Sequence, residues 1–152
     1  MTVNLGRVAM DMSGDTRRGE DAADLARYLR DFEAGGYRVS EVVAAVCPGC
    51  AGRMFRLRAD ADEGCAERTC GECGKTALML DSEDYWDGAV PEEVRCRCGA
   101  DLFEVAVAFS LRASGDVRWV SVGMRCSADG VLGCCVDWKI DYSPSADLLD
   151  RV

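Results

Sequence analysis

Two pairs of Cys constrain this chain more than any other feature of its sequence. Residues 47–50 read Cys-Pro-Gly-Cys and residues 70–74 read Cys-Gly-Glu-Cys-Gly, with nineteen residues between the pairs. Two Cys-x-x-Cys pairs at such a distance are typical of a structural zinc site with four thiolate ligands. The Gly after the second pair fits the tight turn that such ligand pairs need. The sequence therefore predicts a tetrahedral Zn²⁺ site whose ligands are Cys47, Cys50, Cys70 and Cys73.

The second half of the chain resembles the first. Residues 98–105 align without a gap over residues 50–57, and residues 129–137 align in the same way over residues 73–81. Differences in length fall in the hairpin between these segments, where a small sheet tolerates insertions. We interpret the pattern as a tandem duplication, which predicts two metal-binding modules.

The alignment also predicts the ligands of a second site. It places Cys96, Cys98, Cys126 and Asp129 at the four ligand positions, so that a carboxylate stands where the first site has Cys73. Three outcomes stay open. The site forms a Cys₃Asp centre, or water takes the fourth position, or the metal is lost and a larger apolar sheet holds the module together.

Three further Cys fall outside both sets, at Cys65, Cys134 and Cys135. The alignment puts Cys134 and Cys135 in mid-strand, about 17–20 Å from the nearest ligand pair if each extended residue adds about 3.3 Å. A zinc–sulfur bond is only about 2.3 Å long. We therefore expect these three residues to be small hydrophobic side chains or free thiols.

The composition narrows the chemistry and the location. Ten Cys and no His exclude a His-based catalytic triad and a His-ligated catalytic zinc. The first residues lack the pattern of a signal peptide and no stretch is apolar enough to span a membrane, so we expect a cytoplasmic protein with no membrane partner. In that compartment paired Cys are metal ligands more often than disulfides, and a disulfide-rich secreted domain is the alternative.

The charge indicates what kind of partner to expect. The net charge is −9, and residues 83–95 carry five acidic side chains against one basic one. No segment is basic, which disfavours binding to a nucleic-acid backbone. Five basic residues do gather in the first module, and we interpret them as solvated strand faces. They are Arg53, Arg56, Arg58, Arg68 and Lys75.

The N-terminal segment predicts one amphipathic helix, over about residues 20–34. Four apolar side chains form a stripe at helical spacing, with an N-cap expected at Asp15 or Thr16 and a stop at the two Gly residues that follow. A lone helix cannot bury its stripe, so we expect it to pack on the first zinc module or on a partner. Val3, Leu5 and Val8 would form an edge strand. The stripe is Leu25, Tyr28, Leu29 and Phe32.

The Cys motifs resemble those of the zinc-ribbon superfamily over about residues 44–82, with a weaker likeness over residues 94–142. The predicted fold is accordingly small, metal-bound and mostly β. It has two tandem three-stranded antiparallel zinc ribbons, an N-terminal helix and a short C-terminal helix. The expected divisions are an N-terminal segment (1–43), ribbon 1 (44–82), an acidic linker (83–93), ribbon 2 (94–143) and the C-terminal helix (144–152).

Two kinds of ribbon come closer than others. Rubredoxins have similar knuckles around iron, but this chain lacks their aromatic core. Transcript-cleavage elongation factors present an Asp-Glu pair after an Arg at a hairpin tip, and residues 58–63 (Arg-Ala-Asp-Ala-Asp-Glu) stand at that place. That resemblance implies a Mg²⁺ ion held for phosphodiester cleavage inside a polymerase. The hairpin here is shorter, the second copy has no equivalent, and such residues are also ordinary turn formers.

Three classes of function remain open. The favoured one is a non-enzymatic, zinc-binding interaction or regulatory module whose partner is another protein. The alternatives are an RNA polymerase-associated or nucleic-acid-binding factor that uses the acidic tip, and an enzyme or thiol sensor that uses an incomplete second site. Tyr85 and Trp86 in the acidic linker either pin it against a neighbouring domain or contact the partner. The oligomeric state is open.

Overall fold

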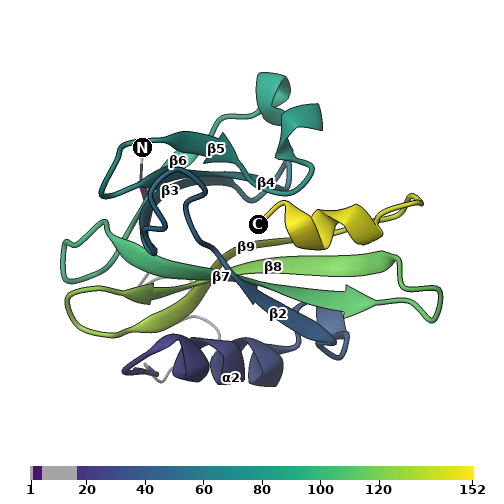
Figure 1. Ribbon diagram of the computed structural model, residues 1–152, viewed down its shortest axis with the longest axis horizontal. Helices are drawn as coiled ribbons and strands as arrows, with labels where there is room; N and C mark the ends of the chain where they lie inside the picture. The colour runs from purple at the N-terminus through teal and green to yellow at the C-terminus, as the bar shows by residue number, and fades with distance from the viewer. Residues whose placement is uncertain (1, 5–16) are drawn as a thin grey trace.

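The computed structural model describes residues 2–4 and 17–152. In these residues one α-helix accompanies a nine-stranded, mostly antiparallel sheet (Figure 1), which confirms the prediction of a small, mostly β fold. The strands are β1 (Thr2–Asn4), β2 (Glu41–Ala44), β3 (Met54–Asp60), β4 (Cys65–Cys70), β5 (Thr76–Leu78), β6 (Glu92–Arg95), β7 (Phe103–Leu111), β8 (Val117–Cys126) and β9 (Leu132–Lys139). The helices are α2 (Ala22–Phe32) and the 3-10 helices η1 (Ala34–Gly36), η2 (Ser82–Asp84), η3 (Trp86–Gly88) and η4 (Ala146–Asp150).

The sheet contains two three-stranded antiparallel meanders. In the first half β3 pairs with β4 and β4 with β5, and in the second half β7 pairs with β8 and β8 with β9. The meanders join because their first strands also pair, with Met54 opposite Glu104 and Phe55 opposite Phe103. The two halves therefore share one sheet.

The strands that lead into the Cys motifs cross over between the two meanders. Strand β2 precedes the first motif but pairs with β7, where Ala44 lies opposite Ala106. Strand β6 precedes the second motif but pairs with β3, where Glu93 lies opposite Arg58. Ala44 and Glu93 each stand three residues before the first Cys of their own set. Each half thus supplies a strand to the other, and residues 92 and 93 of the expected linker belong to β6.

The sheet folds into two layers that enclose the main core (Figure 1). Strands β3 to β6 form one layer, and β7 to β9 with β2 form the other, which is covered on its outer face by α2. Strand β3 alternates between buried and exposed residues because only one of its faces meets the core. Strands β7 and β8 are buried along most of their length because the opposite layer covers one face and α2 the other.

Helix α2 is shorter than predicted and packs on a different part of the chain. Its N-cap is Asp21, whose carboxylate accepts a hydrogen bond from the N–H of Asp24 at 3.0 Å. The predicted caps at residues 15 and 16 lie outside the described residues. Leu25 and Leu29 are fully buried against the second half of the sheet, so the expectation of packing on the first module is wrong. The stripe indicates that a face is buried but not what covers it.

Both ends of the chain attach to the sheet. Strand β1 pairs in parallel with β6 at the sheet edge, while Leu5 and Val8 of the predicted edge strand lie outside the described residues. The expected C-terminal helix is the 3-10 helix η4, which lies between the two layers (Figure 1) and buries Leu148. Within the described part of the chain, no helix combines the length and hydropathy needed to cross a membrane.

Candidate metal centres

The first four predicted ligands come together at one end of the β3–β4–β5 meander. Cys47 and Cys50 lie in the loop before β3, Cys70 ends β4, and Cys73 lies in the turn before β5. Their sulfur atoms all lie within 4.8 Å of one another. The Sγ atoms of Cys47 and Cys73 are 3.6 Å apart and those of Cys50 and Cys70 are 3.5 Å apart. A tetrahedron with zinc–sulfur bonds of about 2.3 Å has edges of about 3.8 Å, so this donor set fits zinc.

Backbone N–H groups favour the ionised form of two of these thiols. The pKa of Cys47 is lowered to about 6, chiefly because the N–H of Gly49 points at its sulfur. The pKa of Cys70 is lowered because the N–H groups of Cys73 and Glu72 do the same, and the Glu72 nitrogen lies 3.4 Å from the Cys70 sulfur. A metal needs thiolates rather than thiols, and the backbone favours them at Cys47 and Cys70. At Cys50 the N–H of Gly52 acts in the same direction, but the neighbouring Cys70 thiol and burial outweigh it and raise the pKa to about 12.

The second predicted set comes together at the corresponding end of the β7–β8–β9 meander. The Sγ atoms of Cys98 and Cys126 are 3.6 Å apart, and the Sγ atom of Cys96 lies 3.7 Å from each carboxylate oxygen of Asp129. One ligand atom from each of the four residues lies within 4.8 Å of the others. Burial raises the pKa of Cys96, to about 12, and that of Cys126, so these thiols are harder to ionise in the absence of metal. This donor set could also hold a metal ion.

The backbones around the two sets make the same hydrogen bonds. In each set the N–H of the first Cys donates to a carbonyl shortly before the following strand. The N–H of the third Cys donates to a carbonyl on the far side of its turn, and the carbonyl of that Cys accepts a hydrogen bond from the Gly of the turn. The matching bonds are Cys47 N–H to Gly52 O and Cys96 N–H to Ala100 O (both 2.8 Å), Cys70 N–H to Lys75 O and Cys126 N–H to Val131 O (both 2.9 Å), and Gly74 N–H to Cys70 O and Gly130 N–H to Cys126 O (both 3.0 Å).

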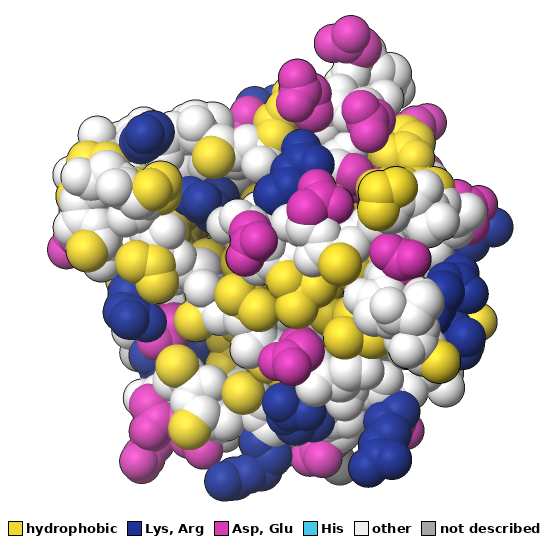
Figure 2. Space-filling view, turned by 45° about the vertical axis from the view of Figure 1, so that its right-hand side comes forward, with side chains coloured by type: hydrophobic (Ala, Val, Ile, Leu, Met, Phe, Trp, Pro, Cys, Tyr) yellow, Lys and Arg dark blue, Asp and Glu magenta, His cyan; other side chains and the backbone are white. Residues whose placement is uncertain are grey.

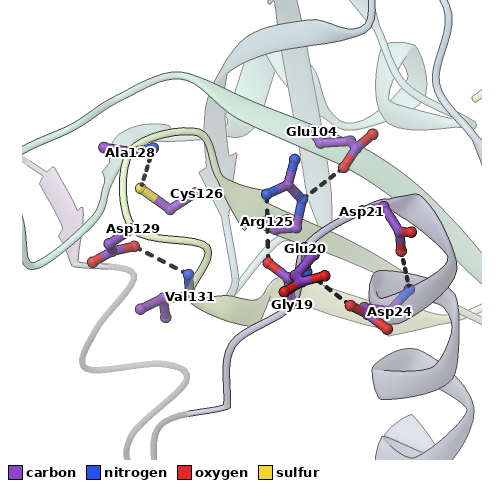
Figure 3. Close-up of polar contacts among 10 residues, drawn as sticks. All are labelled: Gly19, Glu20, Asp21, Asp24, Glu104, Arg125, Cys126, Ala128, Asp129 and Val131. Atoms are coloured by element: carbon purple, nitrogen blue, oxygen red, sulfur yellow. Dashed lines mark hydrogen bonds and ion pairs between the residues drawn. The ribbon is translucent and has the colours of Figure 1, made fainter.

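Asp129 is held in place by its own turn (Figure 3). Its Oδ1 atom accepts a hydrogen bond from the N–H of Val131 at 3.0 Å. Burial opposes ionisation of this carboxyl group, but the N–H of Val131 and the neighbouring thiols hold its pKa below the ordinary value. Asp129 is therefore a carboxylate at neutral pH, with its second oxygen free of the bond to Val131.

The segment before α2 attaches to the turn that carries Asp129. Gly19 donates its N–H to the carbonyl of Gly130 at 2.9 Å, and Leu132 donates to the carbonyl of Arg17 at 2.8 Å. Gly130 has a φ of 75°, and a Cβ atom there would lie 2.7 Å from the Gly19 carbonyl oxygen, so this contact requires Gly. Figure 3 shows Arg125 beside the same segment, in an ion pair of 2.8 Å with Glu104.

The other three Cys lie in strands, away from both sets. Cys65 begins β4, and Cys134 and Cys135 lie within β9. All three are buried, and neither set includes them. Burial raises the pKa of Cys65 to about 11 and that of Cys135 to about 12, and raises the pKa of Cys134 well above its ordinary value. They are protonated thiols packed as small apolar side chains.

The acidic tip between β3 and β4 uses one of its carboxylates to build the turn. Asp60 accepts hydrogen bonds from the N–H groups of Asp62 at 2.9 Å and Glu63 at 3.1 Å, and from that of Val90 at 2.8 Å. The pKa of Asp60 is lowered, above all by the N–H of Val90, and then by those of Glu63 and Asp62. This carboxylate therefore joins the tip to the segment before β6.

The two linker aromatics have different surroundings. The Arg58 guanidinium lies over the Trp86 ring, 5.6 Å from its centroid, which attaches η3 to β3. Tyr85 is 40% exposed and lines a hollow together with Trp138. The sequence gives no functional signal for Trp138, because its position in an alternating strand predicts only burial.

The two candidate centres share a cysteine-rich donor set. All ten Cys lie in the described residues, and none is in a disulfide. The eight predicted ligands form the two groups that could each hold a metal ion, one with four sulfur donors and one with three sulfurs and a carboxylate. No protein-family model, curated protein or solved structure matches this chain.

Proposed function

We propose that this chain is a zinc-binding, non-enzymatic interaction module built from two zinc ribbons that arose by tandem duplication. One observation carries the proposal. Two four-ligand sets lie at corresponding ends of two meanders, and their backbones make matching hydrogen bonds at matching lengths. A common ancestor explains both the alignment in sequence and this agreement in geometry.

The metal in both centres is zinc, and its role is structural. Zinc prefers tetrahedral sites with sulfur ligands and has no redox chemistry of its own. Four protein ligands close the coordination shell, whereas a catalytic zinc keeps a position open for water or substrate. The metal therefore fixes the loops before β3 and β7 and the turns after β4 and β8.

The two alternative functions have less support. A transcript-cleavage role needs the Asp62 and Glu63 carboxylates to hold Mg²⁺ together with further ligands, and among the described residues the tip forms no group that brings three ligand atoms within 4.8 Å of one another. Its third carboxylate, Asp60, is engaged by three backbone N–H groups. A catalytic second site needs a hollow beside the metal for a substrate. Neither the hollow lined by Arg56 and Arg58 nor the one lined by Tyr85 includes Asp129.

Native mass spectrometry combined with metal analysis tests the proposal. We expect two zinc ions for each chain, released in two steps by a graded chelator, and the same spectrum gives the number of subunits. A red protein with thiolate-to-iron bands would instead indicate a rubredoxin-like electron carrier. A metal-free protein that melts cooperatively would contradict the proposal, because the binding energy of structural zinc is folding energy in such small modules.

A further inference from the structure

A hollow of about 290 Å³ lies where the β3–β4 turn meets the end of β9 and the junction between η2 and η3. We call it the tip pocket. Its walls include two aromatic rings, from Tyr85 and Trp138, and three carboxylates, from Asp62, Glu63 and Asp141. Pockets for drug-sized ligands span about 300–1,000 Å³, so the tip pocket has the size for one side chain.

The charge of the tip pocket is negative. Its one basic residue is Lys139, whose Nζ atom lies 3.8 Å from the carboxylate of Asp141, with both side chains 70% exposed. Asp62 and Glu63 have no ion-pair partner among the described residues. The surrounding segment is acidic as well, and Figure 2 shows Asp and Glu side chains gathered at the top of the molecule, where η2 and η3 lie. Anionic ligands are therefore repelled.

The carboxylates do not converge as metal ligands do. In the part of the chain that the structure describes, the groups that bring three or more ligand atoms within 4.8 Å of one another are the two thiolate-rich centres. The three acidic residues of the tip pocket instead line the same hollow as Tyr85 and Trp138. This arrangement suits an organic cation, which can contact a ring with its charged group and a carboxylate with its N–H groups.

The walls of the tip pocket are fixed before any ligand binds. The Trp138 indole N–H donates to the buried carboxylate of Asp81 at 3.1 Å. The turn packs directly on this ring, because Gly64 has a φ of 75° and a Cβ atom there would lie 2.9 Å from Trp138 Cβ. The pKa of Tyr85 is raised by burial and then by the charges of Asp81, Asp84 and Asp141, as expected for a ring in negative surroundings.

We infer that the tip pocket binds a lysine or arginine side chain presented by a basic segment of a partner protein. The inference rests on the proposed role as an interaction module and names the chemistry of its partner. The exposed ring of Tyr85 attracts the cation, the buried Trp138 ring forms part of the lining, and Asp62, Glu63 and Asp141 neutralise the charge. Lys139 acts against binding by its like charge.

NMR titration of the zinc-loaded, ¹⁵N-labelled protein tests this inference. The probes are three acetylated, amidated Gly-X-Gly peptides in which X is lysine, arginine or the neutral norleucine. We expect saturable shifts of the Gly64 amide, the Trp138 indole and the Lys139 amide with the two cationic peptides, weakened by salt, and none with norleucine. Equal binding of norleucine, or no saturable shift with either cationic peptide, would overturn the inference.

Variants with opposite expected signs sharpen the test. Glu63→Gln should weaken binding about fivefold and Lys139→Gln should strengthen it, while Glu41→Gln on β2 removes the same charge outside the pocket and should change nothing. Tyr85→Leu should weaken binding and Tyr85→Phe should preserve it, because the phenyl ring keeps its attraction for cations. If Glu63→Gln and Glu41→Gln change the affinity for the cationic peptides equally, the tip pocket is not the binding site. Two bound zinc ions without peptide binding would refute the pocket and leave the zinc module standing.

Discussion

Phe55 and Phe103 lie opposite each other in the pairing of β3 with β7, and neither side chain is exposed to solvent. Each stands five residues after the second Cys of its set, so the two residues are counterparts in the sequence alignment. A residue that pairs with its own counterpart lies where a two-fold axis would relate two copies. The same two-fold axis relates the pair Ala44–Ala106 to the pair Glu93–Arg58, because Glu93 is the sequence counterpart of Ala44 and Arg58 is the counterpart of Ala106.

The position of the Phe pair predicts similar costs for equivalent substitutions. Phe55→Ala and Phe103→Ala should each lower the free energy of unfolding by about 3–5 kcal/mol, because each removes a fully buried ring from the shared core. Denaturant unfolding of the zinc-loaded protein measures both. Phe32→Ala at the end of α2, where the ring is only partly buried, is the control and should cost clearly less. A large effect of only one of the two core substitutions would contradict the expected symmetry.

The first zinc centre should be required for the fold of its half. Cys47→Ser or Cys73→Ser should release about one zinc ion and unfold residues 44–82, because metal binding and folding are coupled in such modules. Metal analysis and thermal melting measure the two effects. Since β3 also pairs with β7, we expect the melting temperature of the whole sheet to fall. A variant that keeps both its metal and its melting temperature would refute the four-Cys assignment.

The three strand Cys should be dispensable for metal. Cys65→Ala, Cys134→Ala and Cys135→Ala should each leave two zinc ions bound, because these sulfurs belong to neither ligand group. Each substitution leaves a small cavity in a buried strand, so we expect losses of about 1 kcal/mol in the free energy of unfolding. Zinc quantification after gel filtration separates the two effects. Loss of zinc in any of the three would show that the alignment of the two halves is wrong.

The β3–β4 turn should depend on pH through Asp60. Its folded-state pKa is lowered, so its contribution to stability is present above the ordinary Asp pKa and is lost as pH falls through the folded value. Asp60→Asn should therefore cost about 1 kcal/mol at neutral pH and flatten the acid end of the stability curve. Urea unfolding from neutral to acid pH measures this, with Asp87→Asn on η3 as the control. If the free energy of unfolding falls with acid as steeply in Asp60→Asn as in the unsubstituted protein, Asp60 is not the group responsible.

The sequence predicts local features well and long-range pairing poorly. The eight ligands follow from spacing and from one alignment, and α2 follows from its apolar stripe. That stripe could not reveal that Leu29 packs on Gly123 of β8, where a Cβ atom would lie 2.5 Å from Leu29. The sequence also does not predict that β2 pairs with β7 and β6 with β3, because the partner of a strand depends on which sheet edges are left open. The acidic composition predicts a linker over residues 83–93, but the last two of these residues belong to β6 and pair with β3.

The identity of residue 129 should control how tightly the second centre holds zinc. Asp129→Cys should restore four thiolates and tighten binding, because a thiolate donates more strongly to zinc than a carboxylate does. Asp129→Ala should weaken the second centre and leave the first intact, because the two ligand sets share no residue. Ser127→Ala in the same turn is the control, because the Ser127 side chain is not a predicted ligand. Zinc release against a graded chelator separates the two centres as two steps. If neither substitution at Asp129 moves the second step, the carboxylate only forms the turn through its bond to Val131, and the Cys₃Asp assignment fails.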